Sequence, residues 1–332
     1  MERETLAPLV NPARAVQKRY RNLCRTLSGI EPLLLLLLCI AMPGDDARAE
    51  VPPGGQPPAP YSLPWQLRPA MAISAVRSDT SIAFYRNAQS DPGMTTVTTI
   101  LGSYKVIPSL SPFARLGVVV DEPPGGKRTA AFLNPSVGVL SGLRFGKSLR
   151  LGLFLGLSLP VGMGGGNSPD LAVVAATRNG VFARSVFDNA QFAVNDFGIV
   201  PGASLAYVAH RLTLQAEITV IELIRVRGQA VQSDVSRTNL LTGVHIGYFV
   251  LRQLSLGVDL RYQRWLSTPA SVRADPTGAL RDALTLAVGA RLHFHLRGTT
   301  WLRPGLSYTR GLDNPLAQRD YNILQIDVPV LF

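Results

Sequence analysis

The sequence predicts an all-β protein, a closed antiparallel up-and-down transmembrane β-barrel of about 12 strands, within a range of roughly 10–14. Hydrophobic residues make up 46% of the 332-residue chain and charged residues only 17%. No apolar run reaches roughly 18 residues, so no membrane-spanning helix is expected. Segments of about 10–15 residues instead alternate apolar with small or polar side chains. Their connections alternate between short and long, as in transmembrane barrels.

An export signal is expected at residues 1–49. The basic stretch 14–25 precedes the apolar run 33–42, and residues 47–49 (ARA) supply a small-x-small site for cleavage before Glu50. This order of basic, apolar and small residues favours a signal peptide over a buried core helix.

The rest of the chain is expected to form a Pro- and Gly-rich periplasmic tail at 50–64 and the barrel at 65–332. Both cysteines, Cys24 and Cys39, lie in the signal peptide. A disulfide scaffold, a thiol enzyme and a cysteine-ligated metal site are therefore not expected in the exported part.

The last segment shows the strand pattern most clearly, because its side chains alternate with a period of two. Its apolar face carries Leu324, Ile326, Val328, Val330 and Phe332, and its polar face carries Tyr321, Gln325 and Asp327. The same period predicts strands at 68–85, 94–106, 111–121, 131–145, 149–161, 195–209, 212–225, 238–250, 254–266, 282–296, 300–310 and 320–332. Tight turns are expected at 146–148, 210–211, 251–253 and 297–299, and long loops between the other strand pairs.

Outward aromatic residues are expected to form two girdles at the membrane interfaces. One girdle, near the short turns, is predicted to contain Tyr104, Phe145, Tyr207, Tyr248, Phe294 and Phe332. The other, near the long loops, is predicted to contain Phe197, Tyr262 and Tyr308. A soluble β-sandwich would have polar outer faces instead.

Residues 65–332 resemble the outer-membrane β-barrel proteins of Gram-negative bacteria. The resemblance is sharpest at Val328, Val330 and Phe332, which match the terminal strand that acts in that superfamily as a signal for the barrel-assembly machinery. It implies an outer-membrane location, with lipids, lipopolysaccharide and that machinery as partners. Neither a plug-sized N-terminal domain, as in plugged receptors, nor a soluble domain after the barrel, as in peptidoglycan-tethered proteins, is expected.

The long loop at 162–194 contains the Gly-rich segment 162–167 (GMGGGN), followed by a helix predicted at about 169–178. Asn179 and Gly180 are expected to end that helix. A dinucleotide-binding turn is disfavoured, because Asn167 replaces the third glycine of the fingerprint and no βαβ unit surrounds it. The loop is expected either to enter the lumen or to cover the mouth of the barrel.

Several inward positions are ionisable, and we take Arg144, Arg150, His245, Asp259, Arg261, Arg291 and His293 as candidates for lumen function or selectivity. A three-residue turn would set His245 opposite Asp259, where a bracing ion pair is favoured over an acid–base pair. Arg144 should likewise face Arg150, which suggests an anion-selective ring near the periplasmic mouth. His293 and His295 could share a face, but without a third ligand we favour polar lining over a metal site.

The sequence contains neither a Gly-x-Ser-x-Gly elbow nor a His-x-Ser pair, so no enzyme and no cofactor are predicted. The exported part from Glu50 carries 26 Lys and Arg and 17 Asp and Glu, a net charge of about +9 that is spread singly, which favours acidic lipids or small anionic solutes over nucleic acid as partners. A passive, porin-like channel or small-solute transporter with a mildly basic lumen is the favoured function. Inward glycines would leave room for solute in it: Gly138, Gly142, Gly152, Gly156, Gly202, Gly247, Gly257 and Gly289. The alternative is a closed structural or adhesion barrel, or a lipid-acting enzyme of the outer membrane.

Overall fold

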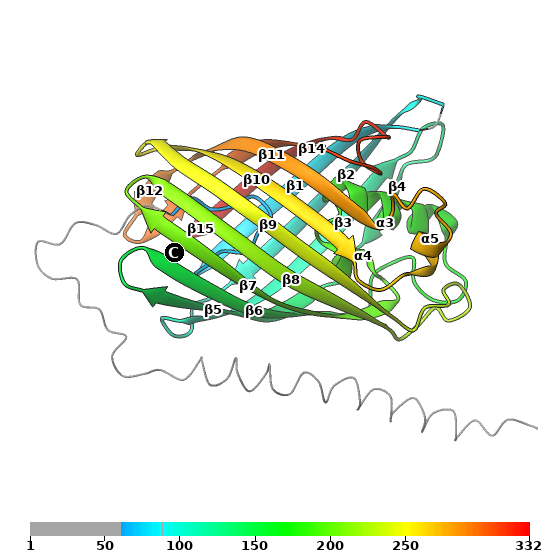
Figure 1. Cartoon of the computed structure of the whole chain (residues 1–332), viewed down its shortest axis with the longest axis horizontal. Helices are drawn as coiled ribbons and strands as arrows, with labels where there is room; N and C mark the ends of the chain where they lie inside the picture. The colour runs from blue at the N-terminus through cyan, green and yellow to red at the C-terminus, as the bar shows by residue number, and fades with distance from the viewer. Residues whose placement is uncertain (1–60, 88) are drawn as a thin grey trace, which may run out of the picture. The chain divides into compact units, whose positions relative to one another are not determined.

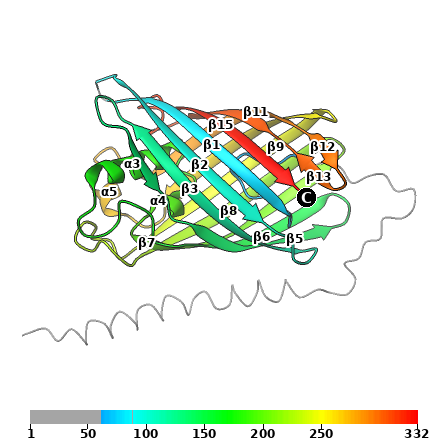
Figure 2. The same ribbon diagram turned by 180° about the vertical axis from the view of Figure 1, so that it is seen from behind.

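The computed structural model describes residues 61–87 and 89–332, which form a closed antiparallel β-barrel (Figure 1 and Figure 2). Twelve strand positions follow one another around the wall of this described part, and β1 pairs with β15 to close it. The strands are β1 (Ala75–Arg86), β2 (Pro92–Ser103), β3 (Leu110–Glu122), β4 (Thr129–Phe132), β5 (Ser136–Phe145), β6 (Leu149–Ser158), β7 (Asp196–Ala209), β8 (Leu212–Arg225), β9 (Ser236–Leu251), β10 (Leu254–Trp265), β11 (Asp282–Leu292), β12 (Phe294–Arg297), β13 (Thr300–Leu302), β14 (Gly305–Gly311) and β15 (Asn322–Leu331). The predicted fold class and strand number are confirmed.

Three predicted strands are each interrupted once. Residues 133–135 separate β4 from β5, His293 separates β11 from β12, and residues 303–304 separate β13 from β14. Two of these breaks contain a proline, which has no N–H group for the strand ladder. The pairing of β3 also shifts by one residue between β4 and β5, as expected for a bulge.

The short turns follow from their residues. Gly146, His210 and Gly298 have positive φ angles of 62°, 51° and 57° at the turns that join β5 to β6, β7 to β8, and β12 to β13. Tight hairpins require this left-handed backbone, which glycine adopts without steric cost.

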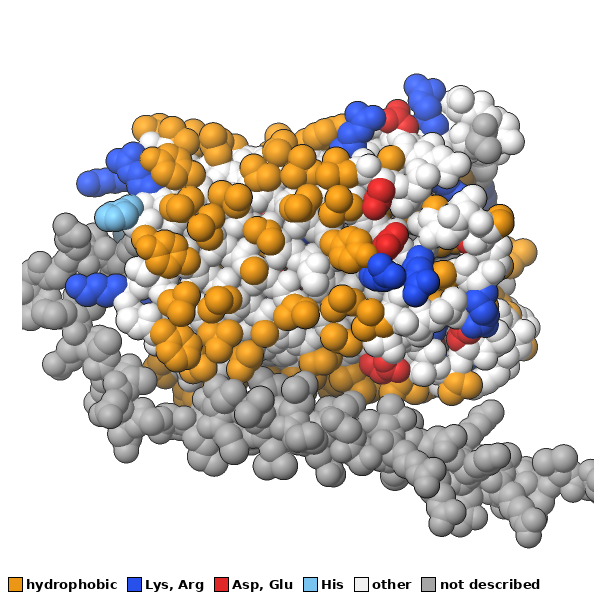
Figure 3. Space-filling view, viewed as in Figure 1, with side chains coloured by type: hydrophobic (Ala, Val, Ile, Leu, Met, Phe, Trp, Pro, Cys, Tyr) orange, Lys and Arg blue, Asp and Glu red, His pale blue; other side chains and the backbone are white. Residues whose placement is uncertain are grey.

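The outer wall is apolar and the inner wall is polar. Along β15, Ile326 is exposed while the neighbouring Gln325 and Asp327 are fully buried. Figure 3 shows hydrophobic side chains spread over the barrel wall, with most charged side chains toward its two ends. The predicted short-turn girdle is exposed, with relative exposures of 42–62% for Tyr104, Phe145, Tyr207, Tyr248, Phe294 and Phe332. This outer surface suits a membrane interior flanked by two interfaces.

The described part of the chain contains three short helices: α3 (Leu171–Ala183), α4 (Asn189–Phe192) and α5 (Ala270–Arg273). Within that part, no helix combines the length and the apolar character needed to cross a membrane.

Residues 61–74, here called the N-terminal segment, run inside the barrel. Trp65, Leu67 and Ala70 have relative exposures of at most 2%. The segment is hydrogen-bonded to the wall. For example, the backbone N–H of Ser62 donates to Oγ1 of Thr213 at 3.0 Å. The first strand therefore begins at Ala75 and not at residue 68. The end of the predicted periplasmic tail, residues 61–64, lies in the lumen, while residues 1–60 are outside the described residues.

Five of the eight predicted inward glycines face the N-terminal segment, which corrects the expectation that these five leave room for solute. A Cβ atom at Gly289 would lie 2.6 Å from Cζ2 of Trp65, and one at Gly152 would lie 2.9 Å from Cα of Ala70. These distances are shorter than any normal contact, so the backbone of the segment passes where wall side chains would otherwise project. Other inward glycines that meet the segment are Gly142, Gly247 and Gly257.

Residues 159–195, here called the lumen loop, also enter the barrel. Figure 1 and Figure 2 both show α3 and α4 within the outline of the barrel, at its long-loop end. Buried residues of the loop form one cluster with inward residues of the wall: Val173, Ala176, Phe182, Val186 and Phe192 with Ala83, Val97, Val119 and Ile323. Of the two expected placements, the lumen is the observed one.

The helix predicted at 169–178 is α3, but its predicted end was wrong. Asp170 caps the helix by accepting a hydrogen bond from the N–H of Ala172 at 2.8 Å. The helix then continues through Asn179 and Gly180 to Ala183. A Cβ atom on Gly180 would clash with the ring of Phe192. Tertiary packing therefore explains a glycine that the sequence suggested was a helix end.

Candidate functional site

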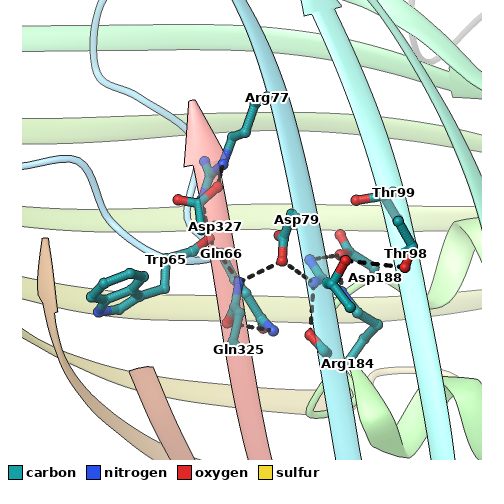
Figure 4. Close-up of polar contacts among 12 residues, drawn as sticks. Trp65, Gln66, Arg77, Asp79, Thr98, Thr99, Arg184, Asp188, Gln325 and Asp327 are labelled. Carbon is teal, nitrogen blue, oxygen red and sulfur yellow. Dashed lines mark hydrogen bonds and ion pairs between the residues drawn. The ribbon is translucent and has the colours of Figure 1, made fainter. Parts of the chain in front are cut away.

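The lumen loop reaches the barrel wall through Arg184, the residue after α3 (Figure 4). Its guanidinium group bonds Asp79 of β1 at 2.9 Å, Ser81 at 3.0 Å and Asp188 at 2.9 Å. Ser185 and Val186 turn the chain back toward α3 with φ angles of 58° and 59°. A left-handed backbone is costly for a β-branched residue, and such strain often accompanies function.

Asp188 extends this contact to a second part of the wall. Arg115 of β3 donates two hydrogen bonds to the Asp188 carboxylate, both of 3.0 Å, which is a bidentate pairing. Burial alone would raise the pKa of Asp188, but the guanidinium groups of Arg115 and Arg184 hold that pKa well below its usual range. Asp188 is therefore ionised and binds the lumen loop to β3.

Polar side chains of β1 and β15 also bind the N-terminal segment. The Nε2 group of Gln325 donates to Asp79 at 2.9 Å and to the carbonyl oxygen of Trp65 at 3.3 Å. Arg77 pairs with Asp327 at 2.6 Å and also donates to the carbonyl oxygen of Trp65. Asp79 thus contacts the lumen loop directly through Arg184 and is linked to the N-terminal segment through Gln325.

His245 and Asp259 lie opposite each other, as predicted from the turn length. The Nδ1 atom of His245 is 2.6 Å from an Asp259 oxygen, and its Nε2 atom is 3.2 Å from Oγ of Ser62. Asp259 also accepts the N–H of Trp65 at 3.1 Å. Ser, His and Asp in this order can activate a nucleophile. However, all three are almost fully buried and none lines the cavity described below, so their contacts favour bracing of the N-terminal segment.

Arg144 and Arg150 also face each other in the β5–β6 pair, as predicted. Arg144 is exposed at the rim, whereas Arg150 is buried and lies 5.3 Å from the ring centroid of Tyr61. Arg150 thus contacts the N-terminal segment, and the anion-selective ring remains a prediction.

Two further arginine candidates also project inward. Arg291 bonds Asp327 and lies 4.5 Å from the centroid of the Trp65 ring. Arg261 donates to Thr309 at 3.0 Å and is almost fully buried. Both arginines lie on the wall of the closed lumen, and their part in selectivity remains a prediction.

The two imidazoles of the His293-x-His295 pair do not share a site. His293 is buried and lies 2.9 Å from Oγ of Ser255, while His295 is exposed and lies 2.7 Å from the carbonyl oxygen of Gly298. The break between β11 and β12 at His293 explains this separation. Among residues 61–87 and 89–332, no group of three His, Cys, Asp or Glu side chains is placed to hold a metal ion.

The terminal residues Val328, Val330 and Phe332 lie on the outward face of the last strand. Val328 and Val330 pair with Ser78 and Val76 of β1, and the N–H of Phe332 donates to the carbonyl oxygen of Ser74 at 3.0 Å. These residues therefore lie at the seam where the barrel closes. Their role as an assembly signal remains a prediction.

A cavity of about 120 Å³ lies between the N-terminal segment and the lumen loop. Its apolar lining includes Ile73, Leu101, Phe113, Leu140, Val200 and Ile221. Its polar lining includes Arg68, Arg77, Arg115, Arg184, Asp79 and Asp188. The cavity thus has an apolar part and a charged part, and both inserted segments and the barrel wall contribute residues to its lining.

Three of the arginines that line this cavity are more accessible than their acidic partners, whereas Arg184 is 1% exposed and its partners Asp79 and Asp188 are 6% and 5% exposed. The Arg68 side chain is 24% exposed and its partner Glu217 is 0% exposed; for Arg77 and Asp327 the values are 14% and 0%. For Arg115 and Asp188 the values are 16% and 5%. A solute in the cavity therefore meets the guanidinium groups of Arg68, Arg77 and Arg115, together with the carboxylates of Asp79 and Asp188, while Glu217 and Asp327 lie outside the lining.

Sequence reasoning did not predict Arg68, Arg77, Arg184, Asp79 or Asp188 as site residues. Arg68 lies in a segment without strand periodicity, and Arg184 and Asp188 lie in the lumen loop. Asp79 and Arg77 fall in the least regular strand. An Arg followed four residues later by an Asp, just after a predicted helix, was the available signal for Arg184 and Asp188.

No family model matches the sequence, and no curated protein matches it either. Among solved structures, the KdgM porin is 8% identical, covering 77% of this chain and 99% of that chain, with a TM-score of 0.43. The COG4313 outer membrane channel from Pseudomonas putida F1 is 12% identical, covering 82% and 100%, with a TM-score of 0.49. The translocator domain of the autotransporter NalP from Neisseria meningitidis is 11% identical, covering 79% and 88%, with a TM-score of 0.42.

The closed wall with its apolar outer face decides the class of the protein. The chain is a closed β-barrel with the outer surface of a membrane-spanning barrel. What this barrel does has to be argued from its own lumen, because likenesses this distant carry no function with them.

Proposed function

We propose that this barrel is a gated channel for small anionic solutes. The observation that carries the proposal is the cavity between the two inserted segments, into which Arg68, Arg77 and Arg115 present their guanidinium groups. Arginine side chains in a pore favour anions, since the low-dielectric surroundings strengthen their field.

The wider lumen supports the same sign of selectivity. Arginines outnumber carboxylates among the described residues that contact the N-terminal segment, the lumen loop or the adjacent inner wall. The arginines are Arg68, Arg77, Arg115, Arg150, Arg184, Arg261, Arg291 and Arg303. The carboxylates are Asp79, Asp121, Asp188, Asp196, Glu217, Asp259 and Asp327, and Arg227 and Arg319 are two further arginines that contact the lumen loop. This excess of positive charge lowers the barrier for an anion relative to a cation.

Gating follows from how the lumen is filled. Both inserted segments occupy the barrel interior, so passage through it requires one of them to move. The N-terminal segment is fixed chiefly by hydrogen bonds and by Trp65, and it carries no helix or strand of its own. We take it as the mobile gate, since a segment with few internal bonds moves at lower cost than the helical lumen loop.

A disulfide between the gate and the wall tests the proposal. The backbone N–H of Ser62 donates to Oγ1 of Thr213 at 3.0 Å, so the thiol of Thr213→Cys would lie beside the backbone of residue 62, where Ser62→Cys supplies the second thiol. Cys24→Ser and Cys39→Ser remove the native thiols. A matched control joins two neighbouring wall strands through Thr80→Cys and Thr98→Cys, whose native hydroxyls are 3.0 Å apart.

Refolded protein in planar bilayers should conduct with a reversal potential that indicates anion selectivity. Oxidation should abolish conductance in the gate pair, reduction should restore it, and the wall pair should conduct in both states. Conductance that survives the cross-linked gate, or that selects cations, would contradict the proposal.

A closed structural barrel is the second candidate, favoured by the paired lumen side chains and by the close packing of Trp65 against Gly289. It predicts no conductance in any of these variants, reduced or oxidised. The same recordings therefore separate the two functions.

A further inference from the structure

We propose that the cavity binds a small carboxylate anion with a compact apolar body. The inference deepens the proposed function by naming a solute class and rests on it for the role in transport, although the binding chemistry stands by itself. Three features of the cavity carry it: its size, its apolar walls and its two incompletely used guanidinium groups.

The size and the walls select the body of the ligand. A dry protein cavity of about 150 Å³ lined by aliphatic and aromatic side chains binds benzene. The present cavity is about 120 Å³ and has Leu140, Val200 and Ile221 on one part of its lining. It therefore fits a single ring or a short branched chain, whereas a sugar would bury hydroxyl groups against hydrocarbon without partners.

Arg68 supplies the strongest anchor for the carboxylate. Its side chain donates one hydrogen bond, from Nη1 to Glu217 at 3.0 Å, and its guanidinium plane lies 4.3 Å from the ring centroid of Phe154. A guanidinium group has five N–H donors, so several remain for a ligand at the exposed edge. The aromatic face holds that edge in a fixed plane, which suits bidentate recognition of a carboxylate.

Arg115 supplies a second anchor. Its side chain makes two hydrogen bonds to Asp188 and one to Thr99, which leaves two of its five donors for a ligand. Arg68 and Arg115 come from the N-terminal segment and from β3, and both line the same cavity. A ligand that bridges them is held jointly by the gate and the wall.

The charge of the site limits the ligand to a single negative charge. Glu217 and Asp188, the salt-bridge partners of Arg68 and Arg115, neutralise much of the field of these two guanidinium groups. A dianion such as phosphate would bring a second charge and a tight hydration shell into largely apolar walls. A neutral analogue would fill the body of the cavity but leave the guanidinium donors unused.

Isothermal titration of the refolded full-length chain in detergent with sodium benzoate tests the inference. Benzyl alcohol serves as the neutral analogue and inorganic phosphate as the dianion. Benzoate should bind at one site, at least tenfold more tightly than either of the others. Equal binding of the three compounds, or no benzoate binding, would overturn the proposal.

Three variants sharpen the titration. Arg68→Gln removes the main anchor and Val200→Phe fills the apolar part of the cavity, so each should weaken benzoate binding at least tenfold. Arg264→Gln changes a partly exposed arginine of β10 that pairs with Asp282 and should alter binding less than twofold. Because Arg68 also ties the gate to Glu217, Val200→Phe decides the case if Arg68→Gln loosens the fold. Unchanged binding in Val200→Phe would place benzoate elsewhere and refute the site.

The titration and the bilayer recordings can refute the binding site and the channel independently of each other. Benzoate binding in a protein that never conducts would refute the gated channel and leave the binding site standing. Anion-selective conductance without benzoate binding would refute this inference and leave the channel standing.

Discussion

Replacing Trp65 with alanine should release the N-terminal segment more than any other single truncation in it. Trp65 is 2% exposed, its ring lies against Gly289 and Gly305, and Arg291 lies 4.5 Å from its centroid. Truncating a buried tryptophan costs about 3–5 kcal/mol. The backbone bonds of residue 65 to Asp259 and Gln325 remain possible, so the loss is confined to the indole ring.

The expected effect follows from that cost. Since each 1.4 kcal/mol corresponds to about a tenfold change in an equilibrium constant, a loss of about 3–5 kcal/mol shifts the docking equilibrium of the segment roughly 100- to 4000-fold. Single-channel recordings should show open events of Trp65→Ala with a frequency raised to that extent. Limited digestion with thermolysin should cut the segment within 61–74 at a correspondingly higher rate while the barrel wall stays intact.

A matched variant, Trp301→Ala, removes an indole from the β12–β13 hairpin at the barrel rim. It should leave both the opening frequency and the protease sensitivity of the segment within about twofold of the parent. If Trp65→Ala behaved like Trp301→Ala in both assays, the segment would not be a gate held by its tryptophan.

Three further variants test the packing, the strain and the charges of the lumen. Gly305→Ala places a Cβ atom 2.5 Å from the Trp65 ring and should also raise the opening frequency, but it should add little in a Trp65→Ala background, as a double-mutant cycle in the same recordings would show. Ser185→Gly relieves a φ angle of 58° and should raise the free energy of unfolding by about 0.5–1 kcal/mol in urea titrations; a decrease would show that the turn is unstrained. The pKa of Asp188 is lowered on folding, so its contribution is complete above the unfolded pKa of about 4 and is lost as the pH falls below it. Unfolding at pH 3 and pH 6 should therefore differ less in Asp188→Asn than in the parent, and an equal difference would refute the assignment.

The wall was predictable because its physics is local. A strand that faces lipid on one side and a polar lumen on the other must alternate, and the short turns fix the register of its neighbour. The register at His245 and Asp259, and at Arg144 and Arg150, followed from turn length alone. Strand limits were less accurate where proline or a bulge interrupted the ladder.

The inserted segments were not predictable in the same way, because their contacts join residues far apart in sequence. Ser62 meets Thr213 and His245, and Arg184 meets Asp79. Nothing in the composition of residues 61–74 separates a lumen segment from a tail, since both lack periodicity. The lumen loop was correctly expected to contain a helix, while its position depended on apolar contacts that could equally have covered the mouth.

The positions of the inward glycines are a sequence signal for a segment inside the lumen. Gly142 faces Gly152 in one strand pair, and Gly257 lies between Gly247 and Gly289 in another three strands. A water-filled lumen does not require glycines in register, because inward polar side chains are readily solvated there. Rows of opposed glycines are instead expected where another backbone crosses the wall closely.

This pattern also indicates where an open path would run. When the N-terminal segment leaves the lumen, the row formed by Gly247, Gly257 and Gly289 is uncovered. His245 and Asp259 on the adjoining wall are uncovered as well, because Ser62, which contacts His245, leaves with the segment. The widest part of the opened lumen should therefore lie along β9, β10 and β11, off the barrel axis. Gly257→Leu should then reduce the conductance of the Trp65→Ala protein, whereas Gly102→Leu, at a position with open space around its Cβ, should not. Equal conductance in the two double variants would place the open path elsewhere in the lumen.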